Sequence, residues 1–300
     1  LSPSNLLELK NHAAENGVLK FNKEFHFASG MQNKMMYKDE IESFMRTPSC
    51  RGIHLLGIQD YSGQGEALIG FLDSFYDEKG FWSSEEVLGC FSSMVSLAEF
   101  EKYGWKNSEI LEVDLLVRNM QNTYDSLIVV FDWKNSAGKS LLKGETEVFS
   151  LNVGDLTKVG KIELDLGNLH NEKITLFTTV VDKSGKEISK PNSWSFWVFD
   201  EVCQPKLSNN VVITNNFDEA LDALNLGQKV ILDASELGKD GKFLKGDWGA
   251  VYWSTTWFPG QSMQTLGLWL DKKQSIFEKF ACEGYGDWIW WNICKNGRIF

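Results

Sequence analysis

Four polar side chains follow a short apolar run, and their types suit the binding of sugar hydroxyls. The run over 53–59 is nearly continuous in apolar residues, as expected of a parallel strand covered on both faces. Gln59, Asp60, Ser62 and Gln64 stand at or just past its end. At the carboxyl end of a barrel strand, such groups could bind a substrate. The alternative is a polar turn in which Asp60 and Ser62 only satisfy backbone donors, and the residues alone leave both open.

The glycines of the same stretch do not form a phosphate-binding motif. Gly63 and Gly65 supply G-x-G, but the next glycine is Gly70, two positions later than a dinucleotide fingerprint requires. The Gly-Lys-Ser/Thr sequence of a P-loop is also absent. The sequence therefore favours a substrate-binding loop or a plain turn over a nucleotide site.

Length, charge and hydropathy limit the classes of partner. A chain of 300 residues suggests two or three domains. A net charge of −11 argues against nucleic acid or an anionic membrane as the main partner. No apolar run approaches the roughly 20 residues that cross a bilayer. The 12 tryptophans first indicate packing, but exposed rings suit the flat apolar faces of sugars.

The cysteines and histidines predict neither a metal nor a cofactor. The five cysteines are odd in number and far apart, which favours buried free thiols over a disulfide framework or a zinc site. The four histidines show no ligand spacing. We therefore expect no metal site and no cofactor.

The chain divides into three regions by pattern. Residues 1–95 alternate helix and strand signals, with helices expected over 5–16, 36–46, 65–76 and 85–92. Residues 96–202 hold short β-rich segments separated by turns, which predict an antiparallel β-sandwich. Residues 209–300 return to mixed α/β signals, beginning with a helix that Gly227 ends.

Several motifs resemble bacterial glycoside hydrolase family 2 proteins, of the β-galactosidase-like or sugar-binding kind. A pattern of the form R-T-x-x-x-x-G-x-x-L-L-x-x-x-D-x-x-G-Q-G is matched by Arg46, Thr47, Gly52, Leu55, Leu56, Asp60, Gly63, Gln64 and Gly65. "ASG" at 28–30, "YK" at 37–38, "NSWSFWVF" at 192–199 and the Trp-rich block at 251–291 also match. The resemblance covers essentially the whole chain.

The resemblance implies a multidomain fold of α/β and all-β parts. Residues 1–95 would be the terminal part of a (β/α)8 barrel, and residues 96–202 an immunoglobulin-like β-sandwich. Residues 209–300 would form a partial amidotransferase-like α/β domain, truncated and non-catalytic. A nucleophilic cysteine there would need a partner histidine, and none follows His170.

The resemblance also implies an activity on β-linked glycans. Family members hydrolyse these with an acid/base glutamate and a nucleophilic glutamate in a retaining mechanism, and both precede the matched segment. The parent would be a retaining glycoside hydrolase, periplasmic or extracellular, whose upstream barrel residues partner this chain. No catalytic residue is assigned here, and this chain alone is expected to be inactive. Glu40 and Glu42 are expected on a solvated helix face.

Two other functions stay open. A non-catalytic carbohydrate-binding protein could retain the same scaffold, and a structural sandwich could bind no ligand. For a binding role the candidate residues are Gln59, Asp60, Ser62, Gln64 and Trp257. Trp257 stands in "TTWFPGQ", where proline and glycine indicate a loop, so its ring is expected on a cleft rim against a sugar. Trp253 and Trp290 are expected in the core, and Trp288 and Trp291 on one helix face.

Overall fold

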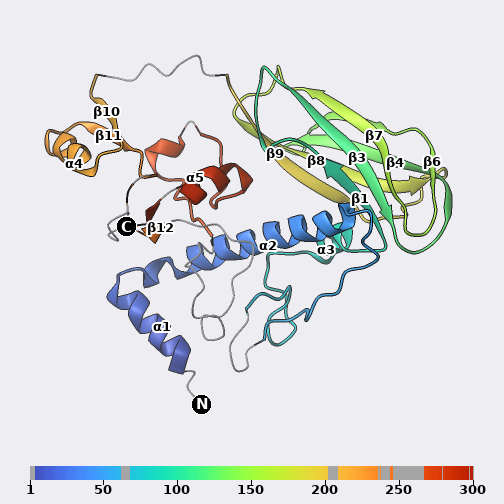
Figure 1. Cartoon of the computed structure of the whole chain (residues 1–300), viewed down its shortest axis with the longest axis horizontal. Helices are drawn as coiled ribbons and strands as arrows, with labels where there is room; N and C mark the ends of the chain where they lie inside the picture. The colour runs from blue at the N-terminus through green and yellow to red at the C-terminus, as the bar shows by residue number, and fades with distance from the viewer. Residues whose placement is uncertain are drawn as a thin grey trace.

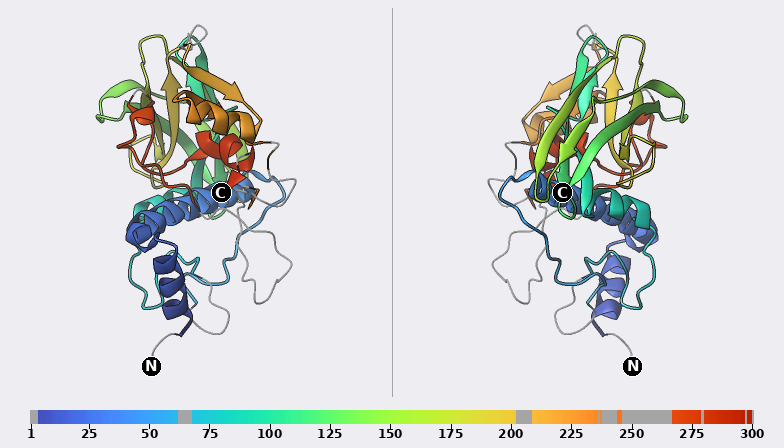
Figure 2. Two further views of the ribbon diagram at one scale, coloured as in Figure 1. Left: turned by 90° about the vertical axis from the view of Figure 1, so that its left-hand side faces the viewer. Right: turned by 90° about the vertical axis from the view of Figure 1, so that its right-hand side faces the viewer.

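The structure is a computed structural model, and most of its regular secondary structure is β. It describes residues 4–61, 68–201, 209–235, 237, 244–245, 267–278, 280–296 and 298–299. A β-sandwich lies at one side of the molecule, α2 runs beneath it, and α1 projects away from both (Figures 1 and 2). The C-terminal elements lie beside the sandwich, over the first half of α2.

The predicted sandwich is confirmed as two facing sheets. The smaller sheet has the order β1 (Met94–Glu99), β3 (Ile110–Asn119), β7 (Leu156–Asp165), all antiparallel. The larger sheet has the order β2 (Gly104–Lys106), β9 (Asn192–Phe199), β8 (Glu172–Asp182), β4 (Tyr124–Asn135), β5 (Ser140–Glu145), with β6 (Phe149–Leu151) also on β4. Only the β2–β9 pair in this sheet is parallel.

Alternating side chains explain why these segments form a sandwich. Leu111, Val113, Leu115 and Val117 of β3 point to one face and are fully buried. Trp133 of β4 lies among them in the core between the sheets. Because each strand has a period of two, one face enters the core and the other meets solvent or a neighbouring element.

The N-terminal region is more helical than its sequence predicts. The helix expected over 5–16 is α1 (Ser4–Glu15), and the helix expected over 36–46 is the end of the longer α2 (Asn22–Arg46). A 3-10 turn, η1 (Leu19–Phe21), joins them. Gly30 lets α2 approach the following segment, since a Cβ there would lie 2.1 Å from Cζ of Phe81.

A short helix follows this region close to where it was expected. It is α3 (Ser84–Cys90), and its cap is Ser83 rather than Ser84. The Ser83 side chain accepts from the Glu86 backbone, and the Glu86 side chain accepts from the Ser83 backbone, which is a capping box.

The strand expected over 53–59 is wrong, and so is a helix over the described part of 65–76. The structure has only isolated bridges here, from Gln59 to Leu72 and from Leu72 to Glu78. A parallel strand needs neighbouring strands to pair its backbone groups, and the described residues provide none for this segment. No βα barrel unit forms in the described residues between 4 and 93.

The C-terminal region contains a small parallel unit. It consists of β10 (Val211–Thr214), α4 (Phe217–Asn225) and β11 (Lys229–Leu232), which confirms the expected helix and its glycine stop. The remaining elements are β12 (Leu244–Lys245), η2 (Ser275–Phe277), η3 (Trp288–Trp290), α5 (Trp291–Asn296) and β13 (Arg298–Ile299). The described elements of this region do not show an amidotransferase-like domain, and that assignment stays a prediction.

A buried arginine joins the end of α2 to the sandwich. Arg118 of β3 is completely buried, and it donates to the carbonyl oxygens of Met45 at 2.9 Å and of Thr47. It also donates to the Gly154 carbonyl at 3.1 Å. The last carbonyls of a helix have no partner within the helix, so a cation placed there satisfies them and interacts favourably with the helix dipole.

We expect Arg118→Met to lower the free energy of unfolding by about 3 kcal/mol or more, because the buried carbonyls lose their donors. Urea denaturation measures the loss. Arg51→Met is the matched control, because Arg51 is exposed and donates to the same Gly154 carbonyl at 3.3 Å. The control should change stability by less than about 0.5 kcal/mol. Equal losses in the two variants would contradict the role given to Arg118.

Candidate functional site

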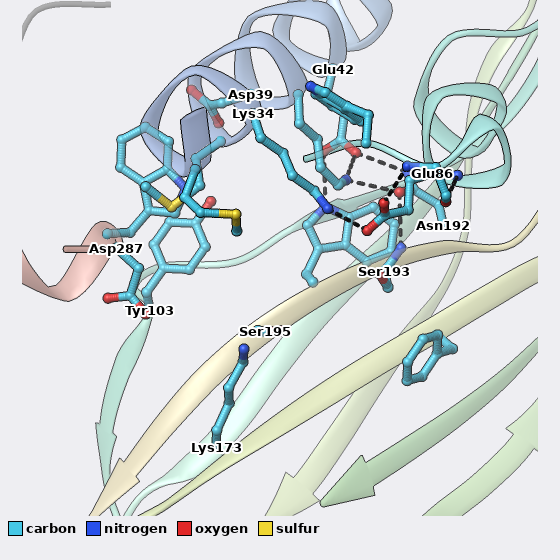
Figure 3. A pocket seen from close by; sticks show the side chains of 18 of the residues that line it. Lys34, Asp39, Glu42, Glu86, Tyr103, Lys173, Asn192, Ser193, Ser195 and Asp287 are labelled. Carbon is cyan, nitrogen blue, oxygen red and sulfur yellow. Dashed lines mark hydrogen bonds and ion pairs between the residues drawn. The ribbon is translucent and has the colours of Figure 1, made fainter. Parts of the chain in front are cut away.

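A cavity of about 400 Å³ opens where α2, the sandwich and the C-terminal segment meet. Its aromatic lining residues are Trp82, Tyr103, Phe177, Trp194, Trp197, Tyr285 and Trp288. Its charged lining residues are Lys34, Lys38, Asp39, Glu42, Glu85, Glu86, Lys173 and Asp287. Figure 3 shows polar side chains of α2, β8 and β9 directed into this space.

One face of α2 supplies a wall of the pocket. Met31, Met35, Lys38 and Glu42 follow at spacings of four, three and four, so they lie along one side of the helix. Asp39 stands next to this row and also lines the pocket. The helical period therefore brings two carboxylates and an ammonium group to the same opening.

Glu42 is the most completely paired of these groups, and its expected place on a solvated face is wrong. The residue is only 2% exposed. Its carboxylate accepts from Lys38 and, at 2.8 Å each, from Asn192 Nδ2 and Trp194 Nε1 of β9, and it pairs with Arg46 at 3.4 Å. On an isolated helix this carboxylate would be hydrated. Here the donors on β9 replace water as its hydrogen-bond partners. Glu40 is exposed, as expected.

A second ion pair joins α2 to α3 at the pocket mouth. Lys34 Nζ lies 2.5 Å from Glu86 Oε1 and 5.5 Å from the centre of the Trp82 ring. Burial alone would raise the pKa of Glu86, but the bonds from Lys34 and Ser83 outweigh it and lower that pKa. Glu86 is thus ionised and fully engaged at neutral pH.

The C-terminal segment closes the far side of the pocket through Asp287. Trp197 Nε1 donates to Asp287 Oδ2 at 2.6 Å, and burial raises the pKa of this carboxyl. The segment is also fixed by an ion pair from Lys173 to Glu283 at 2.7 Å. Rings stack across the same contact, with centroids 5.7 Å apart for Tyr103 and Trp288.

Asp39 and Tyr103 line the pocket with polar side-chain groups that are not engaged in hydrogen bonds within the described residues. Within the described residues, neither the Asp39 carboxylate nor the Tyr103 hydroxyl makes a side-chain hydrogen bond. Burial raises the pKa of Asp39, and nearby Arg46 opposes this effect. Burial also raises the pKa of Tyr103, and the charges of Asp39, Glu42 and Asp287 add to it. Both groups are available to a ligand.

Of the binding residues expected from the sequence, Gln59 and Asp60 are described, and neither lines this pocket. Ser62, Gln64 and Trp257 lie outside the described residues. The backbone of Gln59 bridges to Leu72, and the buried Asp60 carboxylate accepts from the Gly70 amide at 2.7 Å and from Lys79 at 2.8 Å. These contacts fit the turn interpretation that the sequence left open. A role of Gln59 and Asp60 in sugar binding stays a prediction.

One signal in the sequence pointed to the pocket. Lys38, Glu42 and Arg46 stand at successive spacings of four, the arrangement of paired charges on a helix. The pattern indicates that the three side chains interact, but it does not indicate burial. Asp39, Tyr103 and Asp287 carried no comparable signal.

The described residues include free thiols, but no metal-binding cluster and no membrane-spanning helix. No group of three or more His, Cys, Asp or Glu side chains among them is arranged to hold a metal ion. Within the same residues, no helix has the length and apolar character needed to cross a membrane. Cys90 and Cys282 are buried free thiols, whereas Cys50 and Cys294 are partly exposed.

Two family models match the chain, each over less than a third of its length. Both are described as domains of unknown function, DUF8488 over residues 109–200 and DUF8487 over residues 212–300. No curated protein matches the chain.

Solved structures show weak similarity. An exo-chitosanase of Amycolatopsis orientalis is 15% identical with a TM-score of 0.42, over 57% of this chain and 19% of that one. A β-glucuronidase of glycoside hydrolase family 2 is 12% identical with a TM-score of 0.25, over 37% of this chain and 11% of that one. A CARDB domain of Pyrococcus furiosus is 13% identical with a TM-score of 0.29, over 36% of this chain and 94% of that one.

The chain therefore spans about a fifth of the length of the exo-chitosanase and about a tenth of that of the β-glucuronidase. All three TM-scores are below 0.5. The function proposed below consequently depends on the residues of this chain.

We expect Glu42→Gln to lower the free energy of unfolding by about 2 kcal/mol, because two cations lose their counter-charge. The loss should stay below that of a fully buried pair, since Lys38 and Arg46 are each about a fifth exposed. Glu40→Gln on the exposed side of α2 is the control and should be nearly neutral. Urea denaturation of both variants measures these changes. An unchanged free energy of unfolding in Glu42→Gln would show that the network adds no stability.

Proposed function

We propose that this chain contributes a carbohydrate-binding pocket to a glycosidase-like protein that acts on β-linked glycans. The observation that carries the proposal is the composition of the 400 Å³ cavity, where aromatic rings alternate with carboxylate, amide and ammonium groups. Its volume falls within the roughly 300–1,000 Å³ range of small-molecule sites. Such a lining offers apolar faces for sugar rings and hydrogen-bonding groups for their hydroxyls.

The accessible polar groups of the pocket suit hydroxyl recognition. The carboxylates of Asp39 and Asp287 can accept hydrogen bonds from sugar hydroxyls. Tyr103 can both donate and accept, and Ser195 of β9 lines the same space. The ring of Trp288 stacks on Tyr103 at the pocket and supplies an apolar surface.

A non-catalytic binding protein on the same scaffold is the second candidate. Glu42 itself is not a candidate for proton transfer, because its carboxylate is held by Lys38, Arg46 and two neutral donors. In the enzyme hypothesis, the acid/base and nucleophilic glutamates are supplied by barrel strands upstream of the segment that matches the family.

The domain organisation is part of the proposal. Residues 1–95 would be the terminal part of a barrel whose strands other parts of the parent protein supply, and residues 96–202 would be an immunoglobulin-like sandwich. Leu56 is fully exposed, and Ile58 and Phe75 are 52% and 85% exposed. Apolar side chains of this size are normally covered, so their exposure supports a partner surface on this segment.

Residues 209–300 would be a non-catalytic amidotransferase-like domain. Its cysteines support this interpretation, because burial raises the pKa of Cys294 to about 11 and also raises the pKa of Cys282. The nucleophile in such enzymes is the thiolate, and a raised pKa keeps a thiol protonated at neutral pH.

We expect this chain to bind cellotriose, a neutral β-linked trisaccharide, in isothermal titration calorimetry. Trp288→Leu should weaken binding by about 1 kcal/mol, or roughly fivefold, through loss of the aromatic surface. Trp291→Leu is the control, because Trp291 packs 6.0 Å from Trp288 and is not among the lining residues. Equal affinity in both variants would contradict the binding of the sugar against Trp288 in this pocket.

We expect no cleavage of aryl β-glycosides by this chain alone. Loss of one group that transfers a proton removes roughly 100- to 10,000-fold of rate, and here both glutamates are proposed to lie elsewhere. Release of p-nitrophenol above the buffer background measures this. Turnover that a substitution within residues 1–300 abolishes would place the catalytic groups in this chain.

A further inference from the structure

We propose that the pocket prefers a glycan carrying a protonated amine, with the ammonium group bound on the side of the pocket that Asp39, Tyr103 and Asp287 form. This inference rests on the proposed function, since it specifies the ligand of the same pocket. It follows from the balance of charge around the cavity and from the positions of the carboxylates that structural cations do not neutralise.

Each lysine of the pocket already has a carboxylate partner. Lys34 pairs with Glu86 at 2.5 Å, and Lys38 pairs with Glu42. Lys173 pairs with Glu283 at 2.7 Å. Lys38 also donates to Asn192 Oδ1 at 2.8 Å and lies 4.7 Å from the centre of the Trp194 ring. The cations of the site are therefore engaged in holding its walls together.

Two partly buried carboxylates are left without such a partner. Asp39 forms no ion pair within the described residues, and Asp287 is bound only by neutral donors, Trp197 Nε1 at 2.6 Å and the Ile289 amide at 3.3 Å. They come from different parts of the chain, Asp39 from α2 and Asp287 from the C-terminal segment. Figure 3 shows Asp39, Tyr103 and Asp287 on one side of the pocket, apart from the Lys34–Glu86 pair.

An ammonium group is the chemistry that this arrangement lacks. Burial disfavours the charged form of both carboxyls, and an opposite charge nearby reverses that effect. The ring faces of Tyr103 and Trp288 add attraction for a cation. A neutral sugar could accept or donate hydrogen bonds here, but it would bring no charge to two carboxylates that form no ion pair within the described residues. The nearby Arg46 and Lys38 lower the pKa of Asp39, but burial outweighs them. Lys173 lowers the pKa of Asp287, and burial outweighs this effect as well.

The test compares three β-1,4-linked trisaccharides with the same chain by calorimetry at mildly acidic pH. They are the trimer of glucosamine, cellotriose, and the trimer of N-acetylglucosamine, which differ at the 2-position in carrying an ammonium, a hydroxyl or a neutral amide. We expect the glucosamine trimer to bind about tenfold more tightly than either neutral trimer, the value of one charged hydrogen-bonded contact.

Variants assign the preference to the pocket. Asp39→Asn should weaken binding of the glucosamine trimer more than binding of cellotriose and so reduce the preference about tenfold, because an amide can still accept a hydrogen bond from a hydroxyl but cannot neutralise an ammonium group. The Asp39 side chain makes no hydrogen bond within the described residues, so we expect its replacement to leave the fold intact. Asp287→Asn is the second variant, because asparagine can still accept from Trp197. Glu40→Gln is the control, since Glu40 is exposed on the same helix outside the pocket.

The outcomes separate this inference from the proposed function. Equal affinity for the glucosamine trimer and cellotriose would overturn the amine preference and leave carbohydrate binding standing. A loss in Glu40→Gln as large as that in Asp39→Asn would also overturn it, because attraction to the net negative chain would then explain the preference. Failure of all three trimers to bind would overturn the proposed function itself.

Discussion

The carboxylate of Glu42 is buried between α2 and the sandwich, where it meets two cations and two neutral donors. Removing such a charge from water costs several kcal/mol unless other bonds replace its hydration. Here Lys38 and Asn192 bind one oxygen, and Arg46 and Trp194 bind the other. Apolar contacts alone would tolerate a helix displaced along its axis, but these directional bonds do not. The position of every α2 side chain in the pocket depends on them.

The pocket follows from this helix position and from two further contacts. Arg118 fixes the carbonyls at the end of α2, barely one turn beyond Glu42, so the helix is held at two nearby points. The C-terminal segment then meets the sandwich through Asp287 and Trp197. Three parts of the chain that are far apart in sequence thereby enclose one cavity, and each contributes charge to it.

Locally determined features could be predicted from the sequence, whereas those set by distant partners could not. The sandwich over 96–202 has alternating strands and glycine turns, whose pattern needs no long-range information. An apolar run over 53–59 resembles a buried strand equally well, but strand pairing requires neighbours that the described residues lack. Glu42 looked solvated because helix surfaces carry such charges, and its burial is decided by Asn192 and Trp194, about 150 residues away.

The acidic residues of the pocket divide by what surrounds them. Glu42 and Glu86 each face a lysine, and their charge is neutralised within the fold. Asp39 and Asp287 sit in partly buried positions where burial raises their pKa more than the nearby cations lower it, and neither forms an ion pair within the described residues. The ionised form of a carboxylate such as Glu42 is stabilised by cations of the same chain. A carboxylate whose ionisation burial disfavours gains most when a ligand brings a positive charge, and under this condition electrostatics selects one ligand over another.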